Sequence, residues 1–299
     1  MSRHPRTVVC AFAVTGAPPP DEVLAATSGH EEGGPLRVVR AGNLWLVVQD
    51  VPAASFDEQA LAERLNRPDD LERCARAHHR GVEAAARRGP VVPLPMATLY
   101  LTDRTAVRAV TAREAELGAL LDRLRGRTEW AVKVHVADPA TGRTTGPATP
   151  PATGLAPGRA GDGTHATGRT GDDTHATCRT GGRAYLSRAS TRRRAQQDAH
   201  GRALADAEAI DAELRRYAVA ATRHRPQSEQ LTGRRAPQLL NVAYLVDDAE
   251  RAAFTRALDR LGTDGRHPAV EIRTSGPWIP YSFARWTEES DRTEQEVTA

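Results

Sequence analysis

Aromatic residues and lysine are scarce in this sequence of 299 residues. Phenylalanine, tyrosine and tryptophan make up 4% of the chain, so a core has to be built mainly from valine and leucine. Of the 41 basic residues, only Lys133 is a lysine. Such a uniform arginine bias in an alanine-rich chain is most simply explained by GC-rich coding, and it does not by itself indicate a need for guanidinium groups.

Cysteine and long apolar runs are also scarce. Cys10, Cys74 and Cys178 are odd in number and lack the spacing of a disulfide framework. No apolar run approaches the roughly 18 residues that a membrane span needs, and the first residues do not read as a signal peptide. We therefore expect a soluble, reduced, cytoplasmic protein without a membrane partner.

The net charge of +3 is nearly balanced, which argues against a protein whose whole surface binds nucleic acid. Two stretches depart from this balance. Residues 183–235 hold 12 basic and 6 acidic residues, and residues 287–299 hold one basic and five acidic residues. The arginines of residues 188–202 are a candidate phosphate-binding stripe, although a solvated helix face is the favoured interpretation.

The first hundred residues read as strands and helices of one α+β unit. Residues 8–14 are a continuous apolar run, typical of a buried strand, and the runs 36–39 and 44–48 flank Gly42 as in a tight hairpin. A helix is expected over 71–88, where Gly89 and Pro90 end it. The proline-rich residues 90–100 cannot form a central strand, so they predict an extended edge or interdomain segment.

The second part of the chain alternates strands and helices around a low-complexity insertion. We expect an amphipathic helix up to Gly126, a strand at 130–136, and a long helix that includes Leu204 and Ala221. A strand, a short helix and a last strand should follow, at 239–246, 254–261 and 270–273. Residues 138–182 contain an imperfect ten-residue repeat with almost nothing to bury, which predicts a disordered insertion.

These elements predict an α+β protein of two domains, with small mixed or antiparallel sheets covered by helices. The first domain is expected at 1–103 and the second at 104–286, interrupted by the insertion 138–182. Residues 287–299 form an acidic tail that we expect to be flexible.

The search for catalytic and metal sites gives little. Cys74 and His78 are four residues apart on the expected helix, but both lie on its apolar stripe, so a packed thiol and a packed imidazole are favoured over a metal site. His165, His175 and Cys178 owe their spacing to the repeat. We find no phosphate loop and no nucleophile elbow, and we expect no catalytic residues, metal or cofactor.

The most informative stretch is the aromatic segment, residues 275–286. Four aromatic residues fall within positions 278–286, where two prolines keep the backbone extended and display the rings at low conformational cost. One interpretation is a segment stapled across the core by Trp278 and Tyr281; the other is an apolar docking surface for a partner. As partner-binding residues we predict a set of five: Trp278, Ile279, Tyr281, Phe283 and Trp286.

Residues 276–283, Gly-Pro-Trp-Ile-Pro-Tyr-Ser-Phe, closely resemble the C-terminal signature of the GvpL/GvpF gas vesicle proteins. The resemblance extends to residues 241–246, 129–134, 182–186 and 92–94. One departure concerns the proline segment, which the family usually continues with an Arg-Phe-Gly-Thr-like sequence. Here the residues are Pro95-Met96-Ala97-Thr98, which keep only the threonine.

This resemblance implies a two-domain α+β protein with one ferredoxin-like domain, which acts in the assembly of gas vesicles. Such proteins are accessory or minor structural components, not enzymes, thought to bind the very hydrophobic shell subunit and to support nucleation or growth. The expected partners are the shell protein and other accessory proteins, at gas vesicles in the cytoplasm. The alternative is a nucleic-acid-associated protein that uses the arginine-rich helix around 188–202.

Overall fold

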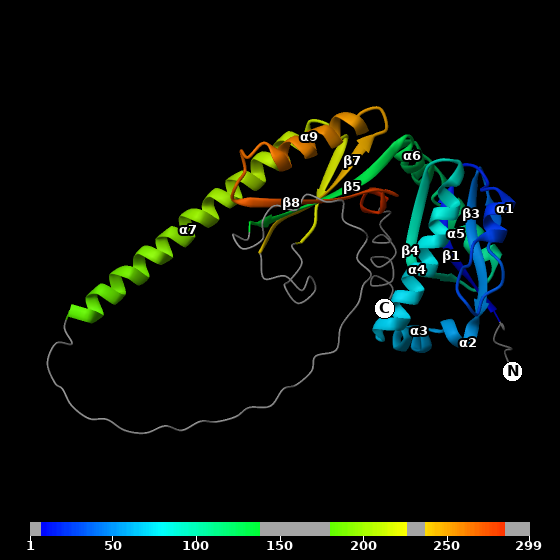
Figure 1. Cartoon of the computed structure of the whole chain (residues 1–299). Helices are drawn as coiled ribbons and strands as arrows, with labels where there is room; N and C mark the ends of the chain where they lie inside the picture. The colour runs from blue at the N-terminus through cyan, green and yellow to red at the C-terminus, as the bar shows by residue number, and fades with distance from the viewer. Residues whose placement is uncertain (1–6, 138–179, 226–236, 285–299) are drawn as a thin grey trace, which may run out of the picture.

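In the computed structural model, which describes residues 7–137, 180–225 and 237–284, the chain forms two sheets with packed helices (Figure 1). We call the four-stranded sheet of the first half sheet A and that of the second half sheet B. Every strand pair in both sheets is antiparallel. The predicted α+β class with small antiparallel sheets is confirmed.

Sheet A has the strand order β2-β3-β1-β4. The first half contains β1 (Thr7–Thr15), α1 (Asp21–Ala26), β2 (Arg37–Ala41), β3 (Leu44–Pro52), α2 (Ala53–Phe56), α3 (Glu58–Leu65), α4 (Pro68–Ala85), the 3-10 helix η1 (Ala86–Arg88), β4 (Val91–Tyr100), α5 (Asp103–Thr111) and α6 (Glu114–Leu124). The hairpin around Gly42, which has φ 65°, and the edge position of the proline-rich β4 are as predicted.

Helix α4 packs unusually closely on β1. A Cβ atom on Gly81 would lie 2.4 Å from the ring of Phe12, so only glycine allows this approach. On the same helix His78 stacks on Phe12 with ring centroids 5.6 Å apart, and its Nε2 lies 3.0 Å from the carbonyl oxygen of Leu94. Cys74 is buried on the same stripe. The two residues that could have formed a metal site are therefore parts of the core.

The amphipathic pattern that ends at Gly126 folds as two helices rather than as one. The chain leaves the helical conformation at Arg113, where φ is −121° and ψ is 22°, and α6 starts again at Glu114. Both helices still bury their apolar stripes, with Val110 on α5 and Leu117 on α6 in one cluster. The hydrophobic period is the same on either side of the break, so the break itself left no signal in the pattern.

Sheet B has the strand order β6-β7-β5-β8. The second half contains β5 (Arg127–Val136), α7 (Thr180–Arg215), β6 (Ala220–Arg223), β7 (Gln238–Asp247), α9 (Arg251–Thr263), β8 (Val270–Trp278) and the 3-10 helix η2 (Tyr281–Phe283). The succession β5-α7-β6-β7-α9-β8 with this order is the ferredoxin-like arrangement that the resemblance implied. Sheet A has the equivalent order, with its fourth strand beside the first and its third between the first and the second.

The expected helix through Ala221 is wrong at its C-terminal end. Helix α7 stops at Arg215, and residues 220–223 form the edge strand β6, paired with β7. The side chain of Asp211, only 2% exposed, ties this corner together: it accepts a 2.6 Å hydrogen bond from Tyr244 of β7 and pairs with Arg215 and Arg223. A four-residue strand has too short a pattern to be recognised, and its pairing with β7 decides its conformation.

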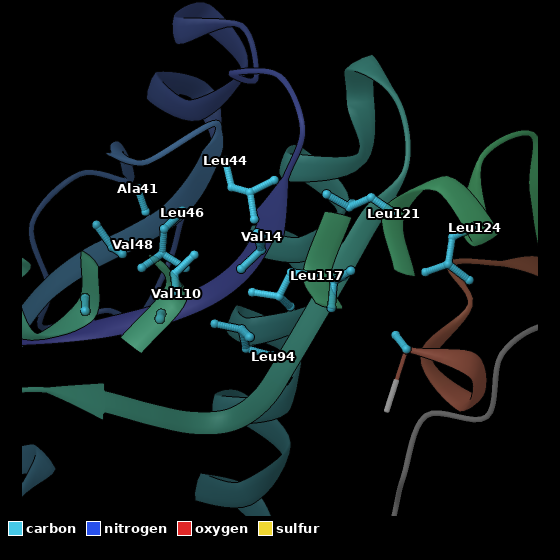
Figure 2. Close-up of a cluster of buried hydrophobic side chains, with 14 of the residues drawn as sticks. Val14, Ala41, Leu44, Leu46, Val48, Leu94, Val110, Leu117, Leu121 and Leu124 are labelled. Atoms are coloured by element: carbon cyan, nitrogen blue, oxygen red, sulfur yellow. The ribbon is translucent and has the colours of Figure 1, made fainter. Parts of the chain in front are cut away.

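The two halves share a hydrophobic core. Figure 2 labels the part of it that comes from the first half. Along β7, Val242 and Tyr244 face the cluster under α7 and α9, whereas Ala243 and Leu245 face a cluster that also contains residues of sheet A, α5 and α6. The predicted domain boundary at 103 separates α5 and α6 from sheet A. Because both helices contact β4, we propose that they be counted with the first half.

Helix α7 extends far beyond sheet B (Figure 1). Its first buried side chain among those described is Ala203, and every residue from Ser190 to Arg202 is exposed. The helix begins at Thr180, so the last three residues of the predicted insertion are helical. The rest of the predicted insertion, 138–179, and the predicted tail lie outside the described residues.

Candidate functional site: the aromatic segment

The aromatic segment, described here up to Ala284, begins with a bulge in β8. Gly276 and Pro277 lie opposite the single residue Trp130 of β5. Gly276 has φ 139°, and a Cβ atom there would lie 2.9 Å from the carbonyl oxygen of Glu129. Glycine is therefore needed at this position for the two strands to stay close. Bulges of this kind redirect the residues that follow them.

Ser282 anchors the segment to β5. Its backbone N–H donates a 2.8 Å hydrogen bond to Glu129 Oε2, and its hydroxyl donates a 2.7 Å hydrogen bond to Glu129 Oε1. Glu129 is 8% exposed, and burial raises the pKa of its carboxyl group, an effect that the two bonds from Ser282 partly offset. His224 Nε2 lies 3.1 Å from the same hydroxyl. One serine thus joins η2 to β5 and to the residue after β6.

Apolar side chains of the segment enter the cores of both halves. Phe283, 6% exposed, and Ala284 belong to the shared cluster with Leu121 and Leu124 of α6. Ile279 packs against a different cluster, formed by β1, α4 and their neighbours in sheet A. These contacts bury area from sheet A and sheet B under one short stretch of chain, which stabilises their association.

Tyr281 lies on the outside of this arrangement. Its hydroxyl is 3.1 Å from His79 Nδ1 on α4, and the other ring nitrogen of His79 is 3.4 Å from Glu83. Tyr281 nevertheless remains 37% exposed. We call residues 278–284 the clasp, because they contact α4, α6 and β5 at once.

The sequence profile of the family described as gas vesicle synthesis protein GvpL/GvpF matches residues 9–285. The chain belongs to the GvpL/GvpF family. It is 35% identical over 286 residues to gas vesicle protein L of a Streptomyces species, with 96% of each chain covered. A shorter match, 40% identical over 45 residues, links it to gas vesicle protein F2 of Halobacterium salinarum, covering 15% of this chain and 20% of that protein.

Solved structures of GvpF share the fold. The crystal structure of GvpF from an Anabaena species aligns with a TM-score of 0.59 at 14% identity, covering 94% of this chain and 98% of that one. GvpF from Microcystis aeruginosa aligns with a TM-score of 0.52 at 13% identity, covering 93% and 99%. The architecture described above is therefore that of known GvpF structures.

The residues predicted to bind a partner fall into two groups in this GvpL/GvpF protein. Trp278 is half-buried and Tyr281 is exposed, whereas Ile279 and Phe283 pack into the cores. Trp286 lies outside the described residues. Trp278 and Tyr281 were the predicted residues of the staple and belong to the predicted contact set as well, but the most buried aromatic ring of the segment is that of Phe283.

Sequence reasoning missed the residues that hold the clasp: Glu129, His79 and His224. Glu129 stood first in the stretch 129–134 that carries part of the GvpL/GvpF resemblance. The sequence signal was an acidic residue directly before the apolar residues of a strand. If such a carboxylate is buried, it needs hydrogen-bond donors, so this pattern predicts a polar partner for Glu129. Nothing in the sequence indicated that Ser282 would supply them.

The chain departs from the GvpL/GvpF pattern in the proline segment, which forms part of β4. In β4 the residues between Pro93 and Thr98 bulge out opposite β1, and Ala97 has φ 68°. This left-handed conformation favours glycine, and Ala97 occupies the place of the glycine in the usual Arg-Phe-Gly-Thr-like sequence. In this chain an alanine therefore takes a backbone conformation that favours glycine.

Across residues 7–137, 180–225 and 237–284, no group of three or more histidine, cysteine or acidic side chains is arranged to hold a metal ion. No helix in these same ranges combines the length and apolarity that a membrane span requires.

Proposed function

We propose that this GvpL/GvpF protein is an accessory or minor structural component of gas vesicle formation that binds the hydrophobic shell subunit and supports nucleation or growth. Membership of the family places the chain in gas vesicle formation. The observation that supports a binding surface is the partial exposure of Trp278 and Tyr281 on a clasp held in place by Glu129.

The physical argument is that rigidly displayed aromatic rings bind apolar surface at low entropic cost. A shell subunit with a large apolar surface tends to aggregate before it is incorporated, so a partner has to cover that surface and later release it. Ile279 and Phe283 support the surface from beneath, and Trp278 and Tyr281 provide the contact. Strand β8 is an edge of sheet B, and its residues 270–273 offer backbone groups for strand addition.

The role that we propose is structural rather than catalytic, at the gas vesicle, with the shell protein and other accessory gas vesicle proteins as partners. No cofactor is part of the proposal. The nucleic-acid alternative has one observation in its favour, the exposed arginines of α7. It predicts a nucleic-acid absorbance spectrum for the purified protein that is lost when Arg192, Arg193 and Arg194 are replaced by glutamine.

The proposal is tested by capture of purified shell subunit on the immobilised protein. Tyr281→Ala, and the double variant Trp278→Ala/Tyr281→Ala, should each bind less shell subunit, because they remove exposed ring surface from the clasp. The matched control is Leu101→Ala, since Leu101 is 65% exposed on the first half. Circular dichroism establishes that each variant is folded.

Capture of shell subunit at wild-type level by folded Tyr281→Ala and by the folded double variant would contradict the proposed contact. A loss that also occurs with Leu101→Ala would mean that the binding is general apolar adhesion.

A further inference from the structure

We call residues 192–202 of α7 its free half. Its arginines have no acidic partners in the described part of the chain. Residues 190–202 contain four arginines, 192, 193, 194 and 202, and one acidic residue, Asp198. None of these arginines makes an ion pair with a described residue, whereas the packed half of α7 pairs Asp206 with His267 and Glu213 with Arg260. Four guanidinium groups without an ion-pair partner among the described residues thus lie on a stretch of helix that is exposed all around.

A helix of this kind is not stabilised by its own residues. It has no apolar face to bury between 190 and 202, and Asp198 is the one acidic residue within that stretch. Isolated helical stretches of about 12 residues are marginal in water. An anionic partner along this surface would offset the repulsion between the arginines.

The chain itself contains a segment of matching charge. Residues 287–299 include the acids Glu288, Glu289, Asp291, Glu294 and Glu296, with Arg292 as the one basic residue. One basic and five acidic residues give this segment a net charge of −4. This charge complements the net charge of +3 that four arginines and one aspartate give the free half of α7.

In the same molecule, Glu288, Glu289 and Asp291 follow Ala284 too closely in the sequence to reach the arginines of this helix. Ala284 comes six residues after the end of β8 and packs in the shared cluster. Asp206 of α7 instead lies near the start of β8, because its Oδ1 is 3.0 Å from Nδ1 of His267, three residues before the strand. A tail that starts at Ala284 has to run back along the length of β8, about 26 Å, to reach Asp206. From Asp206 to Arg194 the helix adds about 18 Å. Glu288, Glu289 and Asp291 lie within seven residues of Ala284, a reach of about 25 Å.

We propose that the free half of α7 binds the acidic segment 287–299 of a second copy of this chain, so that the protein self-associates through exchanged tails. The contact is made of several exposed ion pairs, each weak, so it forms at low ionic strength and dissociates in salt. This inference is independent of the proposed shell-subunit contact, which uses the clasp.

The test uses three chains: the wild type, a chain truncated after Trp286, and the helix variant Arg192→Gln/Arg193→Gln/Arg194→Gln. Glutamine keeps helix propensity while it removes the charges. Light scattering after size-exclusion chromatography should find the wild type self-associated in about 20 mM salt and monomeric in about 0.5 M salt. Each altered chain alone should be monomeric at both salt concentrations.

The decisive arm mixes the two altered chains. The truncated chain supplies the helix and the helix variant supplies the tail, so a 1:1 complex should form at low salt although neither chain associates alone. The control variant Arg87→Gln/Arg88→Gln/Arg104→Gln removes three charges from exposed sites of the first half and should associate like the wild type.

Two monomers in the mixture, or an associated truncated chain, would overturn the proposal. A purified wild type with a nucleic-acid absorbance spectrum, lost in the helix variant, would also overturn it and would assign the helix to a polynucleotide.

Discussion

Glu129 at the start of β5 accepts both hydrogen bonds that Ser282 can donate, from a position 153 residues earlier in the chain. The carboxylate is buried, and its two oxygens are satisfied by one residue of η2. This contact holds the clasp on sheet B, while Phe283 and Ile279 hold it on the first half. The segment that we predicted either as a staple or as a docking surface is a staple whose outer side is exposed.

We predict that Ser282→Ala destabilises the protein. The variant removes the 2.7 Å bond from the hydroxyl and leaves one oxygen of a buried carboxylate without that donor. The free energy of unfolding should fall by about 1–3 kcal/mol. Urea denaturation measures the change, with Ser55→Ala on α2 as the control. An unfolding free energy equal to that of the wild type would mean that the hydroxyl bond is not formed in solution.

Ala97→Gly should stabilise the protein. Ala97 has φ 68°, which costs a residue with a Cβ atom about 1–2 kcal/mol relative to glycine, and the greater freedom of glycine in the unfolded chain takes back part of this gain. We therefore expect a net increase of about 0.5–1 kcal/mol in the free energy of unfolding, measured by thermal or urea denaturation.

The control for this prediction is Ala75→Gly, an exposed position in the interior of α4 where the same substitution should cost about 1 kcal/mol. A loss of stability at both positions would contradict the left-handed geometry of Ala97.

Stability should decrease on acidification because of His30. Its ring is 7% exposed and packs against Phe12 and Phe56, and burial, with His78 and basic side chains nearby, lowers the pKa of His30 to about 4. In the unfolded chain the pKa is about 6.5, so between these values the unfolded state binds a proton that the native state does not. The free energy of unfolding should fall by up to about 3 kcal/mol as the pH drops through this window.

Urea denaturation at a series of pH values tests this. His30→Gln should reduce the slope between pH 4 and pH 6.5, whereas His200→Gln on the exposed half of α7 should leave it unchanged. A slope that is the same in all three proteins would assign the acid sensitivity to other groups. His78, whose pKa burial also lowers, is the first candidate among them.

Strands and helices with a clear hydrophobic period could be predicted from the sequence alone. The apolar run of β1, the hairpin at Gly42 and the alternation of β5 are found as predicted, because burial of one or both faces determines the residue types at each position. The class of the fold and the low-aromatic core follow from the same patterns. The family could also be recognised, because residues 276–283 carry a rare combination of proline and aromatic residues.

Features that depend on contacts between distant residues were decided only by the tertiary structure. The four residues of β6 become a strand because β7 pairs with them, and the break at Arg113 lies within an unbroken hydrophobic period. The burial of Phe283 requires the two halves of the chain to meet, and the bond between Glu129 and Ser282 joins residues 153 positions apart within the second half. A local pattern reports which face of an element avoids water, but it does not report which distant element covers that face.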